Sequence, residues 1–290
     1  MGANVPSMEI HGARVVYEII GRNGAAPLVL TPGGRFSMDE PGVRPLAEKL
    51  AAGGMRVLLW DRPNCGQSDV NFWGRSESHM RADTLAELMT RLDFGPAVIA
   101  GGSGGARDSI LTAILHPEVV SKLAVWWIVG GTYGSLSLAS YYVLPNISSA
   151  RRLGMEGVVN LPNWQEQLRT NPRNKELLLN WDRDAYIRQM LRWLNAYIPK
   201  PGQTIPGVED EEFENIKVPT LIIRSGENDW DHPKRTSYEV HCLIKGSRMV
   251  EPPWPEDAWE KSTAANAAGT GHRFDPWVKA APLLLDFIRE

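Results

Sequence analysis

The segment Gly101-Gly102-Ser103-Gly104-Gly105 is the stretch of this sequence that decides the fold. Before it, residues 97–100 form an apolar run that predicts a buried strand, and after it residues 104–115 predict a helix. The glycines permit a sharp turn in which a Cβ would clash with neighbouring backbone. A serine at such a strand-to-helix turn is a candidate nucleophile, because the helix directs its N-terminal N–H groups toward developing negative charge. The alternative is a plain glycine turn.

Strand and helix signals alternate on both sides of this turn. Alternation of short apolar runs with longer helical segments predicts an α/β fold with a mostly parallel sheet and helices on both faces. The expected strands are a hairpin at residues 9–20 and runs at 28–31, 56–61, 97–100, 123–129, 218–224 and 248–251, and the expected helices are 45–52, 78–92, 104–115, 234–244 and 282–289.

The alternation is interrupted in the middle of the chain, where the apolar residues follow a helical period. We therefore expect a core domain formed by residues 1–130 and 215–290, and an inserted helical cap formed by residues 131–214. The acidic run at 209–212 is interpreted as a solvated hinge between them.

The composition argues against several classes of partner. A net charge of -3 offers no broad basic face for nucleic acid or an anionic membrane. Residues 1–8 lack the pattern of a secretory signal, and two cysteines suit a reducing cytoplasm, so we expect a cytoplasmic protein. No His/Asp/Glu cluster has the spacing of metal ligands, and we expect no metal and no cofactor. The expected partner is a small-molecule substrate, and a homodimer is left open.

A second glycine-rich loop follows the strand at residues 28–31, in the sequence Pro32-Gly33-Gly34-Arg35. In a fold of this kind, a backbone N–H from that loop joins the N–H that follows the nucleophile to bind an oxyanion. By position, the donors are Gly34 and Gly104. The alternative is a plain Pro-Gly turn.

A carboxylate and a histidine are needed to activate the serine. Asp229 follows the strand at 218–224 and is the expected acid, with Asp231 as the alternative. His272 lies in a glycine-rich loop C-terminal to the acid and is the expected general base. We assign His232 to ordering the acid loop. The other four histidines, His11, His79, His116 and His241, are interpreted as structural or surface residues.

Together these motifs resemble the α/β-hydrolase superfamily, in the capped branch that contains esterases, meta-cleavage-product hydrolases and proline iminopeptidases. The resemblance implies a serine hydrolase whose nucleophile, acid and histidine follow in that order. The matching residues are Pro32-Gly33-Gly34, residues 61–68 (Asp-Arg-Pro-Asn-Cys-Gly-Gln-Ser), residues 101–105, Asp229 with His232-Pro233, and Gly271-His272.

The sequence departs from this family at three places. Pro32-Gly33 stands where most relatives have His-Gly, and Gly104 is smaller than the usual residue after the nucleophile. The segment between Asp229 and His272 is unusually long, and we expect its residues 252–269, which include Trp254 and Trp259, to form a second lid.

The leading functional hypothesis is hydrolysis of a carboxylic ester through an acyl-enzyme. Cleavage of a carbon–carbon bond in a vinylogous keto acid, and release of N-terminal proline, are alternatives that use the same three residues. The peptidase would need acidic cap residues such as Glu156 or Glu166 near the site. A non-catalytic ligand-binding module is the alternative from another class.

Aromatic and basic residues suggest the kind of substrate. Trp126, Trp127 and Tyr133, together with Tyr141 and Tyr142, favour an apolar or aromatic substrate, although each also fits ordinary core. Arg35 is expected to bind a free carboxylate, as in a monoester of a dicarboxylic acid. Arg107 and Arg273 also lie beside the predicted motifs, and the alternative is that all three arginines pair with acidic side chains.

Overall fold

A mixed sheet of eight strands, in the order β1-β2-β4-β3-β5-β6-β7-β8, forms the centre of the protein. The structure is a computed structural model that describes residues 5–290, so the first half of the segment searched for a secretory signal, residues 1–4, lies outside the described residues. The hairpin β1–β2 pairs antiparallel with β4, and all later pairings are parallel. The strands are β1 (Ser7–Ile10), β2 (Ala13–Ile20), β3 (Ala26–Thr31), β4 (Met55–Trp60), β5 (Ala97–Gly102), β6 (Val120–Trp126), β7 (Thr220–Ile223) and β8 (Arg248–Val250).

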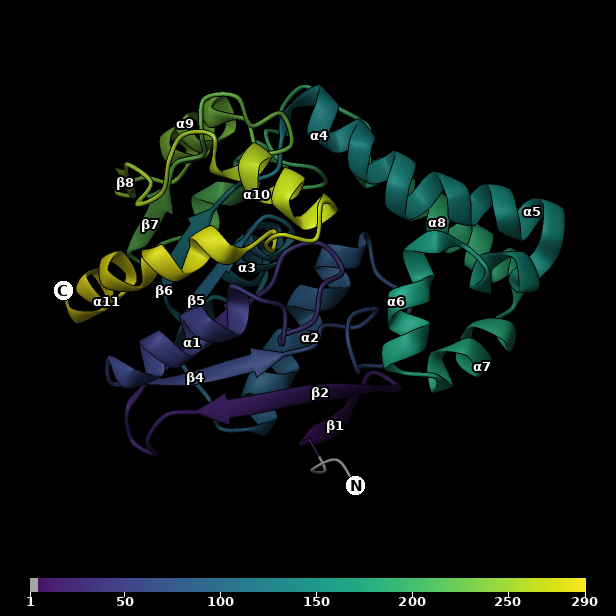
Figure 1. Cartoon of the computed structure of the whole chain (residues 1–290), viewed down its shortest axis with the longest axis horizontal. Helices are drawn as coiled ribbons and strands as arrows, with labels where there is room; N and C mark the ends of the chain where they lie inside the picture. The colour runs from purple at the N-terminus through teal and green to yellow at the C-terminus, as the bar shows by residue number, and fades with distance from the viewer. Residues whose placement is uncertain (1–4) are drawn as a thin grey trace.

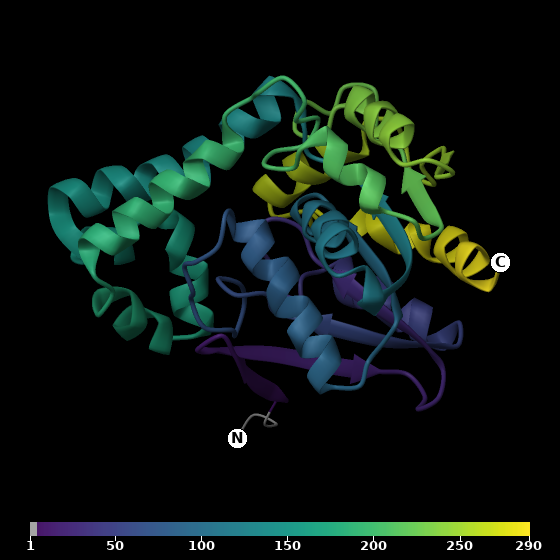
Figure 2. The same cartoon turned by 180° about the vertical axis from the view of Figure 1, so that it is seen from behind.

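Helices cover both faces of this sheet, as the alternation of elements predicts. Successive strand residues point to opposite faces, so Val29 belongs to one apolar core while Leu28 and Leu30 belong to the other. Figure 1 shows one helical layer in front of the sheet, and Figure 2 shows the other from behind. The first layer holds α1 (Val43–Ala52), α10 (Ala258–Ala267) and α11 (Ala281–Arg289), and the second holds α2 (Glu77–Arg91), α3 (Gly104–Leu115) and α9 (Lys234–Leu243).

A group of helices between β6 and β7 lies to one side of the sheet (Figures 1 and 2). It has an apolar core of its own, which includes Trp164, Tyr186 and Trp193. Phe72, from a loop of the sheet domain, packs against all three rings and so attaches the group to the sheet. The helices are α4 (Gly131–Leu138), η2 (Ala139–Val143), α5 (Leu144–Val159), α6 (Pro162–Thr170), α7 (Arg173–Leu179) and α8 (Arg183–Tyr197), and η3 (Asp210–Asn215) leads back to β7.

Two details differ from the sequence-based expectation. Strand β6 ends at Trp126, earlier than expected, because Trp127 adopts a positive φ of 48° that turns the chain out of the sheet. The segment at 252–269 contains a helix of its own, α10.

Among the helices at residues 5–290, none combines the length and the apolar character that crossing a bilayer requires.

Candidate active site

Ser103 occupies the turn between β5 and α3, where sequence analysis placed the candidate nucleophile. Its φ of 56° is in the left-handed region, a strained conformation for a residue with a side chain. The flanking glycines allow this turn: a Cβ on Gly102 would lie 2.2 Å from the Trp126 indole nitrogen, and one on Gly105 would lie 2.3 Å from the Thr31 carbonyl oxygen. The Gly-Gly-Ser-Gly-Gly pattern therefore reflects close packing on both sides of the serine.

The side chain of His232 contacts Ser103. His232 Nε2 lies 2.9 Å from Ser103 Oγ, and His232 Nδ1 lies 2.9 Å from Asp229 Oδ2. The other carboxylate oxygen, Oδ1 of Asp229, accepts backbone N–H bonds from Asp231 (3.1 Å) and His232 (2.8 Å). The loop after β7 thus supplies both an acid and an imidazole, and the three side chains form a continuous hydrogen-bonded series.

The structure places His272 away from this series. Its side chain is exposed, its backbone N–H donates to Asp275 Oδ2 at 2.8 Å, and it makes no hydrogen bond to Ser103. His232, which sequence analysis assigned only to ordering the acid loop, occupies the expected position of His272. The physical reason is the tight turn at Asp229, whose Oδ1 accepts the backbone N–H groups of Asp231 and His232, so that the His232 ring reaches Ser103. In the sequence, the spacing of three residues between Asp229 and His232 was the signal that could have predicted their pairing.

Two tryptophans enclose the His232 ring. Trp127 is nearly parallel to it, with centroids 5.8 Å apart, and Trp259 of α10 meets it edge to face at 4.5 Å. The Trp259 indole N–H donates to Asp231 Oδ2 at 2.9 Å. Asp231, the alternative acid, therefore bonds to the wall of the site and makes no contact with the imidazole through its carboxylate. The packing holds the His232 ring in one orientation.

The two expected oxyanion donors lie side by side. A Cβ on Gly104 would be 2.9 Å from the backbone nitrogen of Gly34, so the two backbones approach closely. Gly104 begins α3, and the first N–H groups of a helix have no intrahelical acceptor. The loop after β3 is held by Arg62, which donates to the Gly33 carbonyl at 2.8 Å and forms a fully buried ion pair with Asp108.

A cavity of about 320 Å³ opens onto Ser103 and His232. This volume suits a small ligand, and the walls are largely aromatic and aliphatic. Helix α10 supplies Trp259 and Thr263, so part of the segment predicted as a second lid borders the cavity. The lining residues are Gly34, Phe36, Ser103, Val129, Gly134, Ser137, Leu138, Tyr141, Tyr142, Asp231, His232, Trp259, Thr263, Arg273 and Phe274.

Of the five aromatic residues expected near the substrate, Tyr141 and Tyr142 line this cavity, whereas Trp126, Trp127 and Tyr133 do not. Trp126 is fully buried behind the nucleophile turn, where its ring packs edge to face against Trp277. Trp127 lies behind the lining, where it packs against the rings of His232 and Trp259. Tyr133 is 59% exposed at the surface. Phe36, Trp259 and Phe274, which were not named as substrate-binding residues, complete the aromatic wall.

Arg35 is also absent from the lining. It is buried and pairs with Glu77, its Nε donating to Oε1 at 3.1 Å, while the Trp164 ring of α6 lies 4.2 Å from its guanidinium carbon. Burial alone would raise the pKa of Glu77, but Arg35 and Arg81 lower this pKa to about 2. Arg35 therefore serves as a charged contact between the sheet domain and the helices that follow β6, which was the alternative interpretation.

The acidic residues suggested for amine binding lie elsewhere as well. Glu156 is exposed, and Glu166 bonds to Arg169 on the exposed face of α6. Neither lines the cavity at Ser103.

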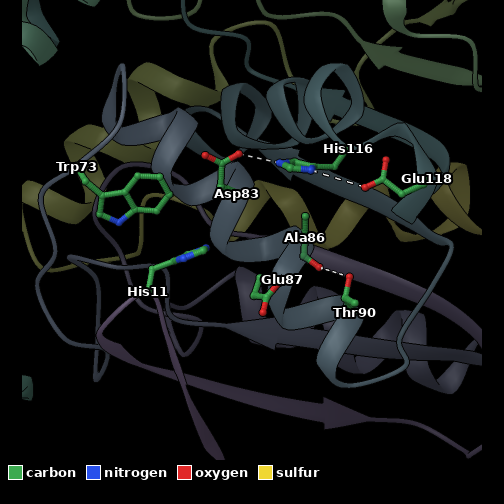
Figure 3. Close-up of a pocket in the computed structure, with 8 residues that line it drawn as sticks. All are labelled: His11, Trp73, Asp83, Ala86, Glu87, Thr90, His116 and Glu118. Atoms are coloured by element: carbon green, nitrogen blue, oxygen red, sulfur yellow. Dashed lines mark hydrogen bonds and ion pairs between the residues drawn. The ribbon is translucent and has the colours of Figure 1, made fainter.

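A second cavity, of about 530 Å³, lies beside α2 and contains no residue of the Ser103 series (Figure 3). Its three acidic side chains already have partners: Asp83 lies 2.7 Å from His116 Nε2, Glu118 lies 3.7 Å from His116 Nδ1, and Glu87 pairs with Arg91 at 2.6 Å. Within the described part of the chain, no three His, Cys, Asp or Glu side chains gather as a metal site would require. The cavity at Ser103 is the better candidate for catalysis.

Comparison with known proteins identifies the family. The model of the alpha/beta hydrolase family matches residues 28–283. The human protein named serine hydrolase BPHL is 23% identical over 257 residues, which cover 86% of this chain and 79% of that protein. A Burkholderia vietnamiensis 2-hydroxy-6-oxononadienedioate/2-hydroxy-6-oxononatrienedioate hydrolase is 31% identical over 121 residues, which are 42% of this chain and only 41% of that protein. The crystal structure of the enol-lactonase from Burkholderia xenovorans LB400 superimposes with a TM-score of 0.59 at 20% identity, over 98% of this chain and 100% of that one. The chain belongs to the alpha/beta hydrolase family.

Proposed function

We propose that this protein is a serine hydrolase that cleaves a carboxylic ester through an acyl-enzyme intermediate. Ser103 is the nucleophile, His232 the general base and Asp229 the residue that orients the imidazole. One observation supports the proposal above the rest: His232 lies 2.9 Å from Ser103 Oγ on one side and 2.9 Å from Asp229 on the other. This geometry is what proton transfer from serine to imidazole needs. Membership in the family supports a hydrolase activity.

In the proposed reaction, Ser103 Oγ attacks the ester carbonyl carbon while its proton passes to His232 Nε2. The carbonyl oxygen becomes an oxyanion and is bound by the N–H groups of Gly34 and Gly104. Collapse of this intermediate breaks the bond to the alcohol, which leaves with the proton from His232. Water then attacks the acyl-enzyme with the same base, so that the acid is released and Ser103 is restored.

The cavity walls support an apolar or aromatic acyl group. Phe36, Tyr141 and Tyr142 present ring surface beside Ser103, and Leu138 and Val129 add aliphatic surface. We include esters that also bear a free carboxylate, such as monoesters of dicarboxylic acids, in the proposed substrate class.

Hydrolysis of a carbon–carbon bond in a keto acid is the second candidate. It is favoured by the similarity to the Burkholderia vietnamiensis hydrolase, whose name describes a dienedioate substrate. Release of N-terminal proline has less support, because Glu156 and Glu166 are exposed and do not line the cavity. A purely ligand-binding role would leave the hydrogen-bonded Ser103 without a purpose.

Two measurements test the proposal. A fluorophosphonate should label the chain once, at Ser103, and the S103A variant should not be labelled. A panel of p-nitrophenyl esters, a dienoate keto acid and a prolyl-arylamide should then give the highest kcat/KM on an ester. A chain that is neither labelled nor active on any member of the panel would contradict the proposal, and a higher kcat/KM on the keto acid would favour the second candidate.

A further inference from the structure

The cavity at Ser103 contains one cationic side chain, Arg273. Asp231 supplies the one carboxylate of the lining, and this carboxylate already accepts the Trp259 indole N–H. Arg273 has no carboxylate within ion-pair distance and no side-chain hydrogen bond among residues 5–290. Its Nε atom is shielded from solvent with no partner in that part of the chain. A ligand can reach the two terminal nitrogens of the guanidinium, because they make no hydrogen bond in that part of the chain and are not shielded from solvent.

Aromatic rings hold this guanidinium in place. Its central carbon lies 5.1 Å from the centroid of Phe36 and 5.8 Å from that of Trp259, and both rings also line the cavity. These distances are within the range of cation–π attraction. Phe36 is itself fixed by an edge-to-face contact with Phe274, with centroids 5.2 Å apart. The group is therefore held at the cavity wall while its N–H donors stay available.

The other two arginines beside the sequence motifs lack this availability. Arg35 donates to both oxygens of Glu77, and Arg107 donates to Ser78 at 2.8 Å and to the Tyr197 hydroxyl at 3.0 Å. Burial raises the pKa of the Glu40 carboxyl, and Arg273 is the strongest of the charges that oppose this rise, although no Glu40 oxygen lies within ion-pair distance of the guanidinium. Among residues 5–290, no carboxylate forms an ion pair with Arg273, so its N–H donors can still bond to a ligand.

We propose that Arg273 binds a carboxylate on the substrate and so determines specificity for acidic substrates. The inference rests on the proposed function: the scissile carbonyl lies at Ser103 and a second, ionised carboxyl group of the same molecule lies at Arg273. The guanidinium can donate two parallel N–H bonds to the two carboxylate oxygens. The substrate class is a monoester, lactone or keto acid with a free carboxylate at the far end of an apolar chain.

The test compares matched substrates in the R273Q variant. Mono-p-nitrophenyl glutarate carries the carboxylate, and its methyl ester is the neutral counterpart with the same leaving group. R273Q should lower kcat/KM on the acid by about 10- to 150-fold, the loss expected for a hydrogen bond between charged groups. Its kcat/KM on the neutral ester should fall much less, so the ratio of kcat/KM on the acid to that on the neutral ester reports the role of Arg273. On the acid, R273K should have a kcat/KM between those of the parent and R273Q, because the charge remains and the planar guanidinium is lost.

A matched control and a second readout separate the outcomes. R235Q removes the same charge from α9, where Arg235 is exposed and pairs with Glu239. This variant should leave kcat/KM unchanged on both substrates. Glutarate should inhibit hydrolysis of the neutral ester in the parent and much less in R273Q. Equal losses on both substrates, or no loss on the acid, would overturn the role of Arg273. Because fluorophosphonate labelling of Ser103 is measured separately, failure of this inference is distinguishable from failure of the proposed hydrolase.

Discussion

Two loops at the same edge of the sheet each carry a histidine, and the two side chains differ in burial and in hydrogen bonding. In the loop after β7, His232 is 1% exposed and bonds to both Ser103 and Asp229. In the loop before α11, the His272 side chain is exposed, while its neighbours Arg273 and Phe274 line the cavity. The comparison shows that a glycine-rich setting and a C-terminal position do not determine which histidine meets the serine.

The difference follows from how each loop is held. The carboxylate of Asp229 accepts two backbone N–H groups and closes a tight turn that aims His232 inward, between Trp127 and Trp259. In the other loop, Asp275 accepts the backbone N–H of His272 and leaves the imidazole in solvent. The first loop thus presents an imidazole to Ser103, and the second presents a guanidinium to the cavity.

Replacing the two histidines is the most direct way to break the comparison. H232A should reduce kcat on an ester by several orders of magnitude, as expected when the base of a serine hydrolase is removed, and S103A should match it. H272A should retain activity within a few-fold, since its side chain makes no contact with the series. Thermal melts control for folding. A severe loss in H272A with a mild one in H232A would reverse the assignment.

The two aspartates sharpen the comparison within the first loop. D229N should lower kcat by about 10⁴-fold, because an amide holds the imidazole in the wrong tautomer. D231N should have a much smaller effect, since its remaining carbonyl oxygen can still accept the Trp259 indole N–H. Both variants should melt within a few degrees of the parent. If D231N proves the more damaging change, the acid is Asp231.

Trp259 tests whether α10 supports the His232 ring. W259F keeps an aromatic face against the imidazole but removes the N–H bond to Asp231. We expect a loss of about 1 kcal/mol in the free energy of unfolding and a few-fold decrease in kcat. W254F, at a neighbouring buried tryptophan whose indole nitrogen has no partner within residues 5–290, is the control and should leave kcat unchanged. Identical kcat for the W259F variant and the parent would remove α10 from the support of the site.

The smallest expected effect is on thermal stability, at His116. This histidine is a third kind, because it pairs with a carboxylate but contacts no nucleophile. The hydrogen bond to Asp83 raises its pKa above the usual value. A raised folded-state pKa stabilises the fold fully below the unfolded pKa of about 6.5, and this stabilisation is lost as pH rises through the folded pKa. The D83N variant should therefore melt below the parent at pH 6 and nearly with it at pH 9. A difference in melting temperature that does not depend on pH would contradict this linkage.

The sequence by itself determined the α/β fold, the order of its strands and helices, and the position of the Ser103 turn. These features are local. The spacing of apolar residues along the chain distinguishes strands from helices, and glycines mark positions where a Cβ would collide with neighbouring atoms, as at Gly102 and Gly105. The placement of Asp229 after β7 followed from the rule that the carboxyl ends of parallel strands meet at one edge, and that of Gly34 beside Gly104 followed from the oxyanion-hole pattern of the fold.

Only the tertiary structure decided which histidine meets Ser103 and which arginine is available to a ligand. Both depend on contacts between segments that are far apart in the chain: Trp259 packs against His232, and Glu77 pairs with Arg35. A period or a motif describes neighbours along the chain, and carries no information about which distant side chain satisfies a given charge. For that reason His272 and Arg35 were reasonable expectations from sequence, and the geometry places His232 and Arg273 at the cavity instead.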